Sequence, residues 1–495
     1  MNFSSKPMNV KFPLTPIMTD RRFLLLVLCA AGFLVLFWSQ TLNVPYWQDD
    51  YNFLLDAREA RLAHKPWYSS FFPETKVGFW RPLGFGTYWR FVETVLGGNA
   101  QAAHVTNIVL LIFSAAAVGW FVSTLLDRLY PGKDSVTAGL GAAFLYGIHS
   151  SHFLPVAWAA AANDSICVLF SALTLRFWIV VSAANSRRDV LAAPLVVIFF
   201  VMALLSRDIA FVLPALGLLI SLWLTSQYKP KVTAWVVGLL CIVIALVWLQ
   251  LRNYFTSTVS EAYIFRFGVN IIRNTFCMVL FFFNTPFEAL RYFFYVKASF
   301  GTALWGCSCF VLQVGAFGMM LRGAREQLGK KGIIILGAFF VIGCAPFFLL
   351  NVNCYPYYIS IGLFVYAIIA GLAALRGRLV PAVLFFAVLS STISTLGNYF
   401  LDSTSHIGRA VWAERQLVRL EAMRDVQPRL FSRPIPVLVE DDHKFQGFTS
   451  AGLAYRLGLE VDSIKVLTQG SQEEGKGAVL VVPKQGDVYF RKTGE

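Results

Sequence analysis

"FLLLVLCAAGFLVLFW" at residues 23–38 is followed, after a short gap, by "VPYWQDDYNFL" at residues 44–54. The first stretch belongs to an apolar segment of about residues 23–42, long enough to cross a bilayer as a helix. It is too long for the apolar core of a signal peptide and lacks a small-residue cleavage site, so we expect a retained anchor. Two adjacent acids, Asp49 and Asp50, therefore lie where this helix should emerge into water.

The composition is that of a polytopic membrane protein. The 495 residues are 57% hydrophobic and only 14% charged, whereas soluble chains carry about 25% charged residues. The net charge of +14 does not indicate nucleic acid as a partner, because Lys and Arg collect in the cytoplasmic loops of membrane proteins. The eight Cys show no spacing typical of a metal site or a disulfide framework.

Apolar segments of this kind recur along the chain, and eleven of them predict membrane-spanning helices. They lie at about residues 23–42, 103–126, 136–150, 163–183, 190–205, 209–226, 232–250, 299–321, 332–350, 357–375 and 379–399. Connections rich in Lys or Arg should be cytoplasmic. With eleven spans, all of these connections fall on one side: Arg21/Arg22, Arg187/Arg188, Lys229/Lys231, Arg322 to Lys331 and Arg376/Arg378.

One further apolar segment, at about residues 270–296, is left out of this count. Counting it as a span would move the cluster from Arg322 to Lys331 to the outside. It carries several charges and is interrupted by "NTP". Irregular backbone at membrane depth is tolerated where protein buries it or where it lines a cavity. We therefore predict a re-entrant or outer interfacial segment, within an outer region of residues 251–298.

The last 95 residues differ from the rest. They are polar, with a helical pattern near residues 407–424 and the strand-like runs "PIPVLVE", "SIKVLTQ", "AVLVVP" and "DVYF". The predicted fold class is an α-helical polytopic membrane protein of about eleven spans with a small C-terminal soluble α/β domain. The predicted parts are a cytoplasmic N-terminus (1–22), a membrane domain (23–400) with a long outer loop (44–102), and an outer C-terminal domain (401–495).

The paired acids are the first candidate for chemistry. Carboxylates at a membrane boundary cost desolvation free energy unless they are paired or used. Asp49 or Asp50 could act as the general base that removes a proton from a hydroxyl. The alternative is ion pairing with Arg58 or Arg81. Paired acids could also hold a divalent ion, although we predict neither a metal nor another cofactor.

The stretch "YGIHSSHFLPVAWAAAANDS" closes the third predicted span and opens the fourth. His149 and His152 have metal-ligand spacing if they are helical, but no third ligand stands nearby. Their side chains, with that of Asp164, could instead cap membrane helices or contact an anionic ligand.

Two more outer boundaries carry distinctive side chains. "LLSRDIAFVLPAL" contains Arg207 and Asp208, either an ion pair or a phosphate contact, because the planar guanidinium binds two oxygens. "NVNCYPYYISIG" contains Tyr355, Tyr357 and Tyr358, which are either an interfacial aromatic belt or a platform for a ring. Acids, arginines and aromatics on one face of the membrane suit a sugar linked to a lipid phosphate.

The order of these motifs resembles that of the C-type glycosyltransferases. These are polytopic enzymes that use polyprenyl-phosphate-linked sugars. The nearest likeness is to the protein O-mannosyltransferases and the transmembrane O-mannosyltransferases that carry tetratricopeptide repeats, including bacterial relatives. It runs from about Gln48 to Pro214 and again from Tyr355 to Gly362, under half of the chain.

The resemblance implies a role for each matching position. The acidic pair matches Asp49 and Asp50, one of which would be the catalytic base. The other matches are Arg81, Pro82 and Leu83 with His104 and Asn107; His149, His152 and Trp158 with Asp164; Arg207 and Asp208 with Pro214; and Tyr355 and Tyr357 with Ser360 and Gly362. Ala162 and Cys354 stand where the family often has Arg, and the C-terminal repeats are absent.

The expected reaction is inverting transfer of the sugar to a hydroxyl of a glycan, lipid or protein at the outer face. Asp49 would be the base and Asp50 would orient the acceptor or tune its neighbour. The donor would be bound by Arg81, Arg207, His149, His152, Tyr355 and Tyr357, with help from arginines of residues 251–291. Supporting residues would be Asp164, Asp208, His104 and Asn107.

Two other functions remain open at this point. The chain could be a flippase or exporter of lipid-linked sugars, or a ligase or polymerase that transfers a whole oligosaccharide. Charges concentrated at one face, with nearly charge-free spans, favour an enzyme over a flippase. We expect it to be in the cytoplasmic (inner) membrane, in contact with membrane lipids, with the site and the C-terminal domain on the outer side.

Overall fold

The computed structural model describes most of the chain. The described residues are 21–184, 187–225, 232–257, 264–295, 299–351, 354–377, 380–399, 405–431, 435–439, 450–459, 464–468, 478–482 and 489–492. The predicted cytoplasmic residues 1–20, Lys229, Lys231 and Arg378 lie outside these ranges.

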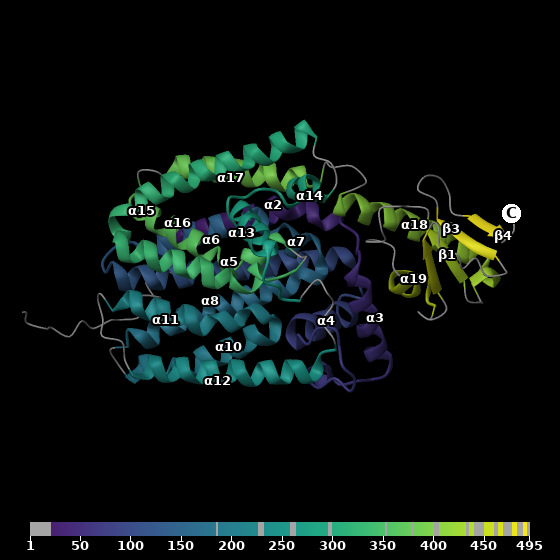
Figure 1. The fold of residues 1–495 in the computed structure, drawn as a ribbon, viewed down its shortest axis with the longest axis horizontal. Helices are drawn as coiled ribbons and strands as arrows, with labels where there is room; N and C mark the ends of the chain where they lie inside the picture. The colour runs from purple at the N-terminus through teal and green to yellow at the C-terminus, as the bar shows by residue number, and fades with distance from the viewer. Residues whose placement is uncertain are drawn as a thin grey trace, which may run out of the picture.

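The protein is a helical multi-pass membrane protein. Six of the described helices are long and apolar enough to cross a membrane, and five further apolar helices are shorter. Figure 1 shows the long helices side by side. The helices that fall on the predicted spans are α2 (Arg21–Trp38), α5 (Ala100–Leu129), α6 (Ser135–Gly147), α8 (Ala162–Ser182), α10 (Ala193–Ser206), α11 (Leu213–Leu224), α12 (Val232–Phe255), α15 (Phe300–Phe348), α16 (Phe364–Ala374) and α17 (Val380–Gly397).

The helix α15 accounts for two predicted spans. Its backbone leaves helical geometry at Gly329, where φ is 58° and ψ is 179°. Glycine adopts positive φ without a steric cost. The break falls inside the predicted connection from Arg322 to Lys331, so each of the eleven predicted spans has a helical counterpart.

Contacts at one end of the bundle agree with the predicted sidedness of the connections. The Tyr130 hydroxyl donates to the carbonyl of Gln327 (2.5 Å), and the Lys331 ammonium donates to Thr225 (3.0 Å). Arg376 pairs with Glu326. The ends of α5, α11 and α16 therefore meet the α15 break at a common end of the bundle. The side of the membrane that this end faces stays a prediction.

The opposite end holds the elements that build the site. They are α3 (Asp49–Leu62), η3 (Pro82–Thr87), α4 (Tyr88–Thr94), η4 (Ser150–His152), α7 (Phe153–Ala157), η5 (Ala159–Ala161), η6 (Asp208–Val212) and η8 (Pro356–Ile359), with the smaller elements η1 (Ser39–Asn43) and η2 (Trp67–Phe71); the short helix α9 (Arg187–Val190) instead joins α8 to α10 at the other end. The predicted outer loop 44–102 is thus largely helical.

The segment at residues 270–296 is broken at the predicted place. Two helices, α13 (Val269–Phe282) and α14 (Phe287–Tyr295), flank the "NTP" sequence, and Asn284 there has a φ of 62°. Asparagine is among the non-glycine residues that tolerate this conformation best. The re-entrant or outer interfacial placement of this segment stays a prediction.

The C-terminal part combines helices with short strands. Helices α18 (His406–Val426) and α19 (Ser450–Leu457), with η9 (Pro428–Phe431), precede or interleave with β1 (Ile435–Val439), β2 (Ile464–Thr468), β3 (Ala478–Val482) and β4 (Tyr489–Lys492). The sheet order is β2-β1-β3-β4, with β4 antiparallel to β3 and the other pairs parallel. The strands overlap the four predicted runs, the last one only at residues 489 and 490, while a separate soluble domain stays a prediction. In Figure 1 this part lies beyond α3 and α4.

Candidate functional site

A cavity of about 340 Å³ lies at the end of the bundle that carries α3. Its walls come from segments far apart in the sequence: α3, η3, η5, η6, the end of α12, the end of α15 and η8. Five charged side chains line it, namely Asp49, Arg81, Arg207, Asp208 and Arg252. The remaining lining is mostly aromatic and aliphatic. Small-molecule sites have this character, with a few polar groups converging in an apolar hollow.

The two adjacent acids face different surroundings. The Asp49 side chain is exposed and opens onto the cavity, where the surrounding protein atoms displace part of its water and so raise the pKa of its carboxyl. Asp50 is fully buried and accepts hydrogen bonds from the backbone N–H groups of Trp47 (3.1 Å) and Ala160 (2.7 Å). Burial raises the pKa of Asp50 well above its usual range, partly offset by these two bonds. The position of Asp50 does not support the predicted catalytic role, because its carboxylate joins α3 to η5 outside the cavity.

The turn before α3 is unusual. Gln48 has φ 52° and ψ −120°, a region that a non-glycine residue occupies only when its surroundings hold it there. The bond from Trp47 N–H to the Asp50 carboxylate closes this turn. Helix α3 then begins at Asp49, and an acid in the first turn is favoured by the partial positive charge of the helix N-terminus.

One cluster of cationic groups surrounds Asp208. Its carboxylate lies 3.6 Å from Arg81 and 3.2 Å from Arg252. The Arg81 guanidinium also packs over the rings of Phe79 (4.9 Å) and Phe85 (5.1 Å). Both arginines remain partly exposed, 14% for Arg81 and 22% for Arg252. The predicted intramolecular pairing of Asp208 is therefore with these two arginines rather than with its neighbour Arg207.

Arg207 belongs to a second, buried cluster. It pairs with Asp164, which also accepts a hydrogen bond from the Ser360 hydroxyl (2.5 Å). The Arg207 guanidinium lies over the rings of Tyr357 (4.7 Å) and Tyr358 (5.4 Å). These contacts join α8, the start of η6 and η8, so the pair serves the structure of the cavity wall as well as its charge.

Of the three predicted tyrosines, two line the cavity and one lies behind them. Tyr357 and Tyr358 line the cavity, whereas Tyr355 stacks on Tyr357 (5.4 Å, 6° between ring planes) from behind. Tyr358 stacks on Phe347 (4.0 Å, 5°). Tyr355 thus supports the aromatic wall rather than forming its surface.

The structure does not bring the predicted histidines to the cavity. His149 is buried, with Nε2 3.3 Å from the Phe282 carbonyl. His152 packs against Tyr146 (4.6 Å), and burial lowers the pKa of His152 to about 3. A neutral buried imidazole offers no charge to a phosphate. The predicted donor contacts of His149 and His152 are therefore not supported by their positions.

Two predicted supporting residues lie beneath the site. The ring nitrogens of His104 are 2.8 Å and 2.9 Å from the carbonyl oxygens of Val156 and Val44. Asn107 accepts a hydrogen bond from Tyr88 (2.6 Å). Both tie α5 to segments that shape the cavity. In the part of the chain that the structure describes, no three His, Cys, Asp or Glu side chains are grouped to hold a metal ion.

Several cavity residues are not predicted individually, and three of them have polar or aromatic side chains that suit a sugar phosphate: Arg252, Trp158 and Tyr358. Arg252 was covered only by the general expectation for arginines of residues 251–291, although it follows a predicted span as Arg207 does. Trp158 appeared only as part of a motif, and Tyr358 only as part of an aromatic belt. Their position at a span boundary is the one sequence signal that marks them.

Neither a family model nor a curated protein matches the sequence. Among solved structures, the chain is similar to ArnT from Cupriavidus metallidurans in the apo state (13% identity, TM-score 0.47) and bound to undecaprenyl phosphate (14%, 0.48). Both matches cover 90% of this chain and 86% of that chain. It is also similar to the archaeal oligosaccharyltransferase AglB from Archaeoglobus fulgidus in complex with an inhibitory peptide and a dolichol-phosphate (12%, 0.47; 92% and 65% covered). Identities and TM-scores this low establish no shared substrate or reaction.

Proposed function

We propose that this protein transfers a sugar from a polyprenyl-phosphate-linked donor to an acceptor hydroxyl at the outer face of the membrane. The observation that carries the proposal is the cavity itself. It joins a carboxylate that forms no ion pair with any described residue, Asp49, to a group of arginines and to aromatic walls.

The charges of the cavity suit one phosphate. Three arginines, Arg81, Arg207 and Arg252, face two carboxylates, Asp164 and Asp208. Asp49 is a third carboxylate of the cavity, but it forms no ion pair with these arginines among the described residues, so the paired cluster by itself holds one guanidinium more than it has carboxylates to face the phosphate of the donor. Arg81 and Arg252 are the better placed, because Arg207 is committed to a buried pair. Preorganised cations that meet a developing negative charge lower the barrier to group transfer.

Asp49 is the proposed general base. Its carboxylate takes the proton of the acceptor hydroxyl as the acceptor oxygen attacks the anomeric carbon. The bond from that carbon to the phosphate oxygen breaks, and polyprenyl phosphate leaves with its charge against the arginines. A single displacement inverts the anomeric carbon. The raised pKa of Asp49 makes it a stronger base than an ordinary aspartate.

The apolar walls suit the remaining parts of the donor. Trp158 and Tyr357 offer ring faces to a sugar. Trp248 and Phe347 form an aromatic wall, and Phe211, 39% exposed, stands where the cavity meets the outer surface of the helix bundle. We place the start of the prenyl chain there.

Glycan analysis of cells with and without the chain tests this function. We expect cells lacking it to lose one sugar residue from a glycan of the cell envelope and to accumulate the lipid-linked donor, both measured by mass spectrometry. Loss of a whole oligosaccharide would favour a ligase or polymerase. Sugar transfer would be contradicted if the glycan profile is the same with and without the chain, provided that the unmodified cells are shown to express the protein.

Arg81 provides a test of phosphate recognition. Arg81→Ala should weaken binding of undecaprenyl phosphate by about tenfold or more, the size expected for one charge-assisted contact. Arg81→Lys should bind with intermediate affinity, because Lys keeps the charge but not the two-pronged geometry. Binding would be measured in detergent with purified protein. Arg322→Ala, which changes an exposed arginine in the helix at the other end of the bundle, is the control. Equal affinity of Arg81→Ala and the control would remove Arg81 from the phosphate site.

A further inference from the structure

Helices α18 and α19, which we name the C-terminal clamp, pack against the chain on both sides of Asp49. The ring of His406, the first residue of α18, lies 5.2 Å from that of Trp47. The ring of Tyr455, on α19, lies 6.2 Å from that of Tyr51. Trp47 and Tyr51 are each two residues from Asp49, so the clamp brackets the turn that places the proposed base.

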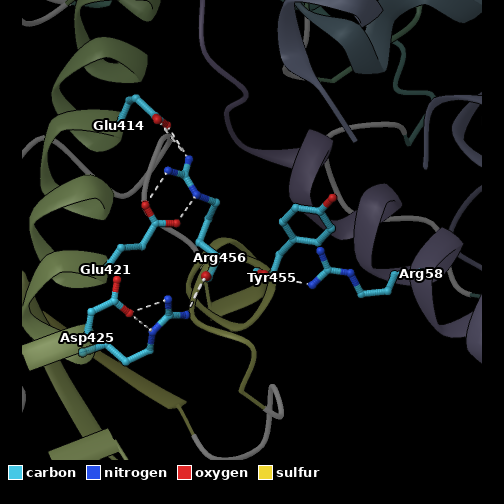
Figure 2. A network of polar contacts seen from close by, with 7 residues as sticks. Arg58, Glu414, Glu421, Asp425, Tyr455 and Arg456 are labelled. Carbon is cyan, nitrogen blue, oxygen red and sulfur yellow. Dashed lines mark hydrogen bonds and ion pairs between the residues drawn. The ribbon is translucent and has the colours of Figure 1, made fainter. Parts of the chain in front are cut away.

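The contact of the clamp with α3 is specific. The Arg58 guanidinium lies 3.7 Å from the centre of the Tyr455 ring and donates to the Tyr455 carbonyl (2.9 Å). The Tyr455 hydroxyl donates to Glu93 (2.9 Å), whose carboxylate also pairs with Arg61 (3.2 Å). Figure 2 shows Arg58 and Tyr455 facing each other across the junction of α3 and α19. The Glu93 side chain is only 4% exposed, and its charge is met by Arg58 and Arg61 of α3 and by the Tyr455 hydroxyl of α19.

A notch in the membrane part receives Tyr455. Gly98 has a φ of 68°, and a Cβ atom at this position would lie 2.1 Å from the Tyr455 hydroxyl. Both the conformation and the space therefore exclude a side chain at residue 98. A notch that only glycine permits, together with a buried acid beneath it, is a built docking site for this tyrosine.

The clamp is braced internally. Arg456 binds Glu421 through two nitrogens (2.7 Å and 2.9 Å) and Glu414 through a third contact of 2.7 Å, which locks α19 to α18 (Figure 2). Two-pronged arginine–carboxylate pairs are strong and directional. The neighbouring Arg424 binds Asp425 within α18 and donates to the Arg456 carbonyl (3.3 Å), and none of these partners lies on α3.

The clamp is also anchored at its start. Glu288 on α14 accepts hydrogen bonds from the backbone N–H (2.9 Å) and the ring Nδ1 (2.6 Å) of His406, and it pairs with Arg291. Although burial raises the pKa of Glu288, these partners hold that pKa down at about 2. The carboxylate is therefore ionised at neutral pH. One end of the clamp is thus tied to α14 and the other to α3.

We infer that the C-terminal clamp supports the active site from outside the cavity, and that Arg58, Glu93 and Tyr455 are positioning residues that hold Asp49 in the cavity. The inference rests on the proposed function for the role of Asp49. The strained backbone at Gln48 gives the physical reason, because such a turn persists only when its surroundings over-determine it. Asp50 holds the turn from within, and the clamp holds it from the other flank of α3.

The test compares Tyr455→Ala with Arg424→Ala in the purified full-length protein. Hydrogen exchange measured by mass spectrometry should be roughly tenfold faster at the first-turn amides of α3 in Tyr455→Ala, with little change in the spanning helices. Arg424→Ala, which alters the same helices without touching α3, should exchange like the unmodified protein. Tyr455→Phe keeps the ring over Arg58 and loses only the bond to Glu93, so its change should be smaller and in the same direction.

A second readout follows Asp49 directly. An apolar carbodiimide labels protonated carboxyl groups, and partial desolvation raises the pKa of Asp49. The pH at which its labelling falls by half should therefore lie above the usual aspartate value. Tyr455→Ala should move that pH back toward the usual value. The other charged groups of the cavity, Arg81, Arg207, Asp208 and Arg252, are the same in every variant.

Matching exchange rates and labelling curves for Tyr455→Ala and Arg424→Ala would overturn the inference. If Tyr455→Ala does not fold, the comparison is made with Tyr455→Phe. Exchange rates and labelling curves of Tyr455→Phe equal to those of Arg424→Ala would likewise overturn the inference. Neither measurement depends on sugar transfer. The clamp can therefore fail while transfer is confirmed, and it can be confirmed even if the chain transfers no sugar.

Discussion

Asp49→Asn should lower sugar transfer by about 10²–10⁴-fold, the loss typical of removing a general base. The substitution is nearly isosteric, and no described residue forms a hydrogen bond or ion pair with Asp49 that it would break. The side chain opens onto the cavity, so the folded protein should tolerate the amide. Transfer would be measured as restoration of the glycan in cells lacking the native chain, beside the thermal stability of the purified variant.

The pH dependence of transfer adds to this prediction. Partial desolvation raises the pKa of Asp49, and the base acts only after it has lost its proton. Transfer should therefore increase as the pH rises through that pKa and should fall under more acidic conditions. The midpoint should lie above the usual aspartate value.

Asp50→Asn is the matched comparison, and its expected effect is on stability. The Asp50 carboxylate accepts two backbone hydrogen bonds with no exposure to water. An amide has one acceptor oxygen and would turn its NH₂ group toward one of the two N–H donors. An unsatisfied buried donor costs about 1–3 kcal/mol. A fully stable but inactive Asp50→Asn, with an active Asp49→Asn, would exchange the two roles. Full transfer by both variants would make a lipid-linked sugar flippase the better reading.

Arg207→Ala should destabilise the protein by about 3–5 kcal/mol, because it leaves the buried Asp164 carboxylate without its charged partner. Among the described residues, the Ser360 hydroxyl would still donate a hydrogen bond to that carboxylate. The measurement is the thermal unfolding midpoint of purified protein in detergent. This expected effect is larger than the loss of donor contact first predicted for Arg207 from the sequence, since the structure commits the guanidinium to Asp164.

Removing both charges separates the two possible roles of Arg207. The double variant Arg207→Met with Asp164→Leu should recover most of the stability, because apolar replacements of a buried pair are often neutral or stabilising. If Arg207 also meets the donor phosphate, binding of undecaprenyl phosphate should stay weakened in the double variant. Arg207→Ala with the unfolding midpoint of the native protein would show that the pair contributes little.

The sequence alone predicts the helical framework well. Each of the eleven apolar segments corresponds to a helix or to one half of α15. The break at "NTP" and the four short strands also lie at or beside their predicted positions. The reason is that segment length and apolar content are local properties, and a membrane requires every spanning segment to satisfy its own backbone as a helix. The same reasoning placed Asp49, Arg81 and Arg207 at a common end of the bundle.

Only the tertiary structure separates the residues at that end. Asp49 and Asp50 are neighbours in sequence, but successive residues of a helix point about 100° apart, so packing decides which one faces the cavity. His149 and His152 lie at the right depth and are buried away from it, whereas Arg252 and Tyr358 line it. The contact of Tyr455 with Arg58 joins positions 397 residues apart. Side-chain direction and such distant contacts depend on how helices pack together, which no local pattern in the sequence encodes.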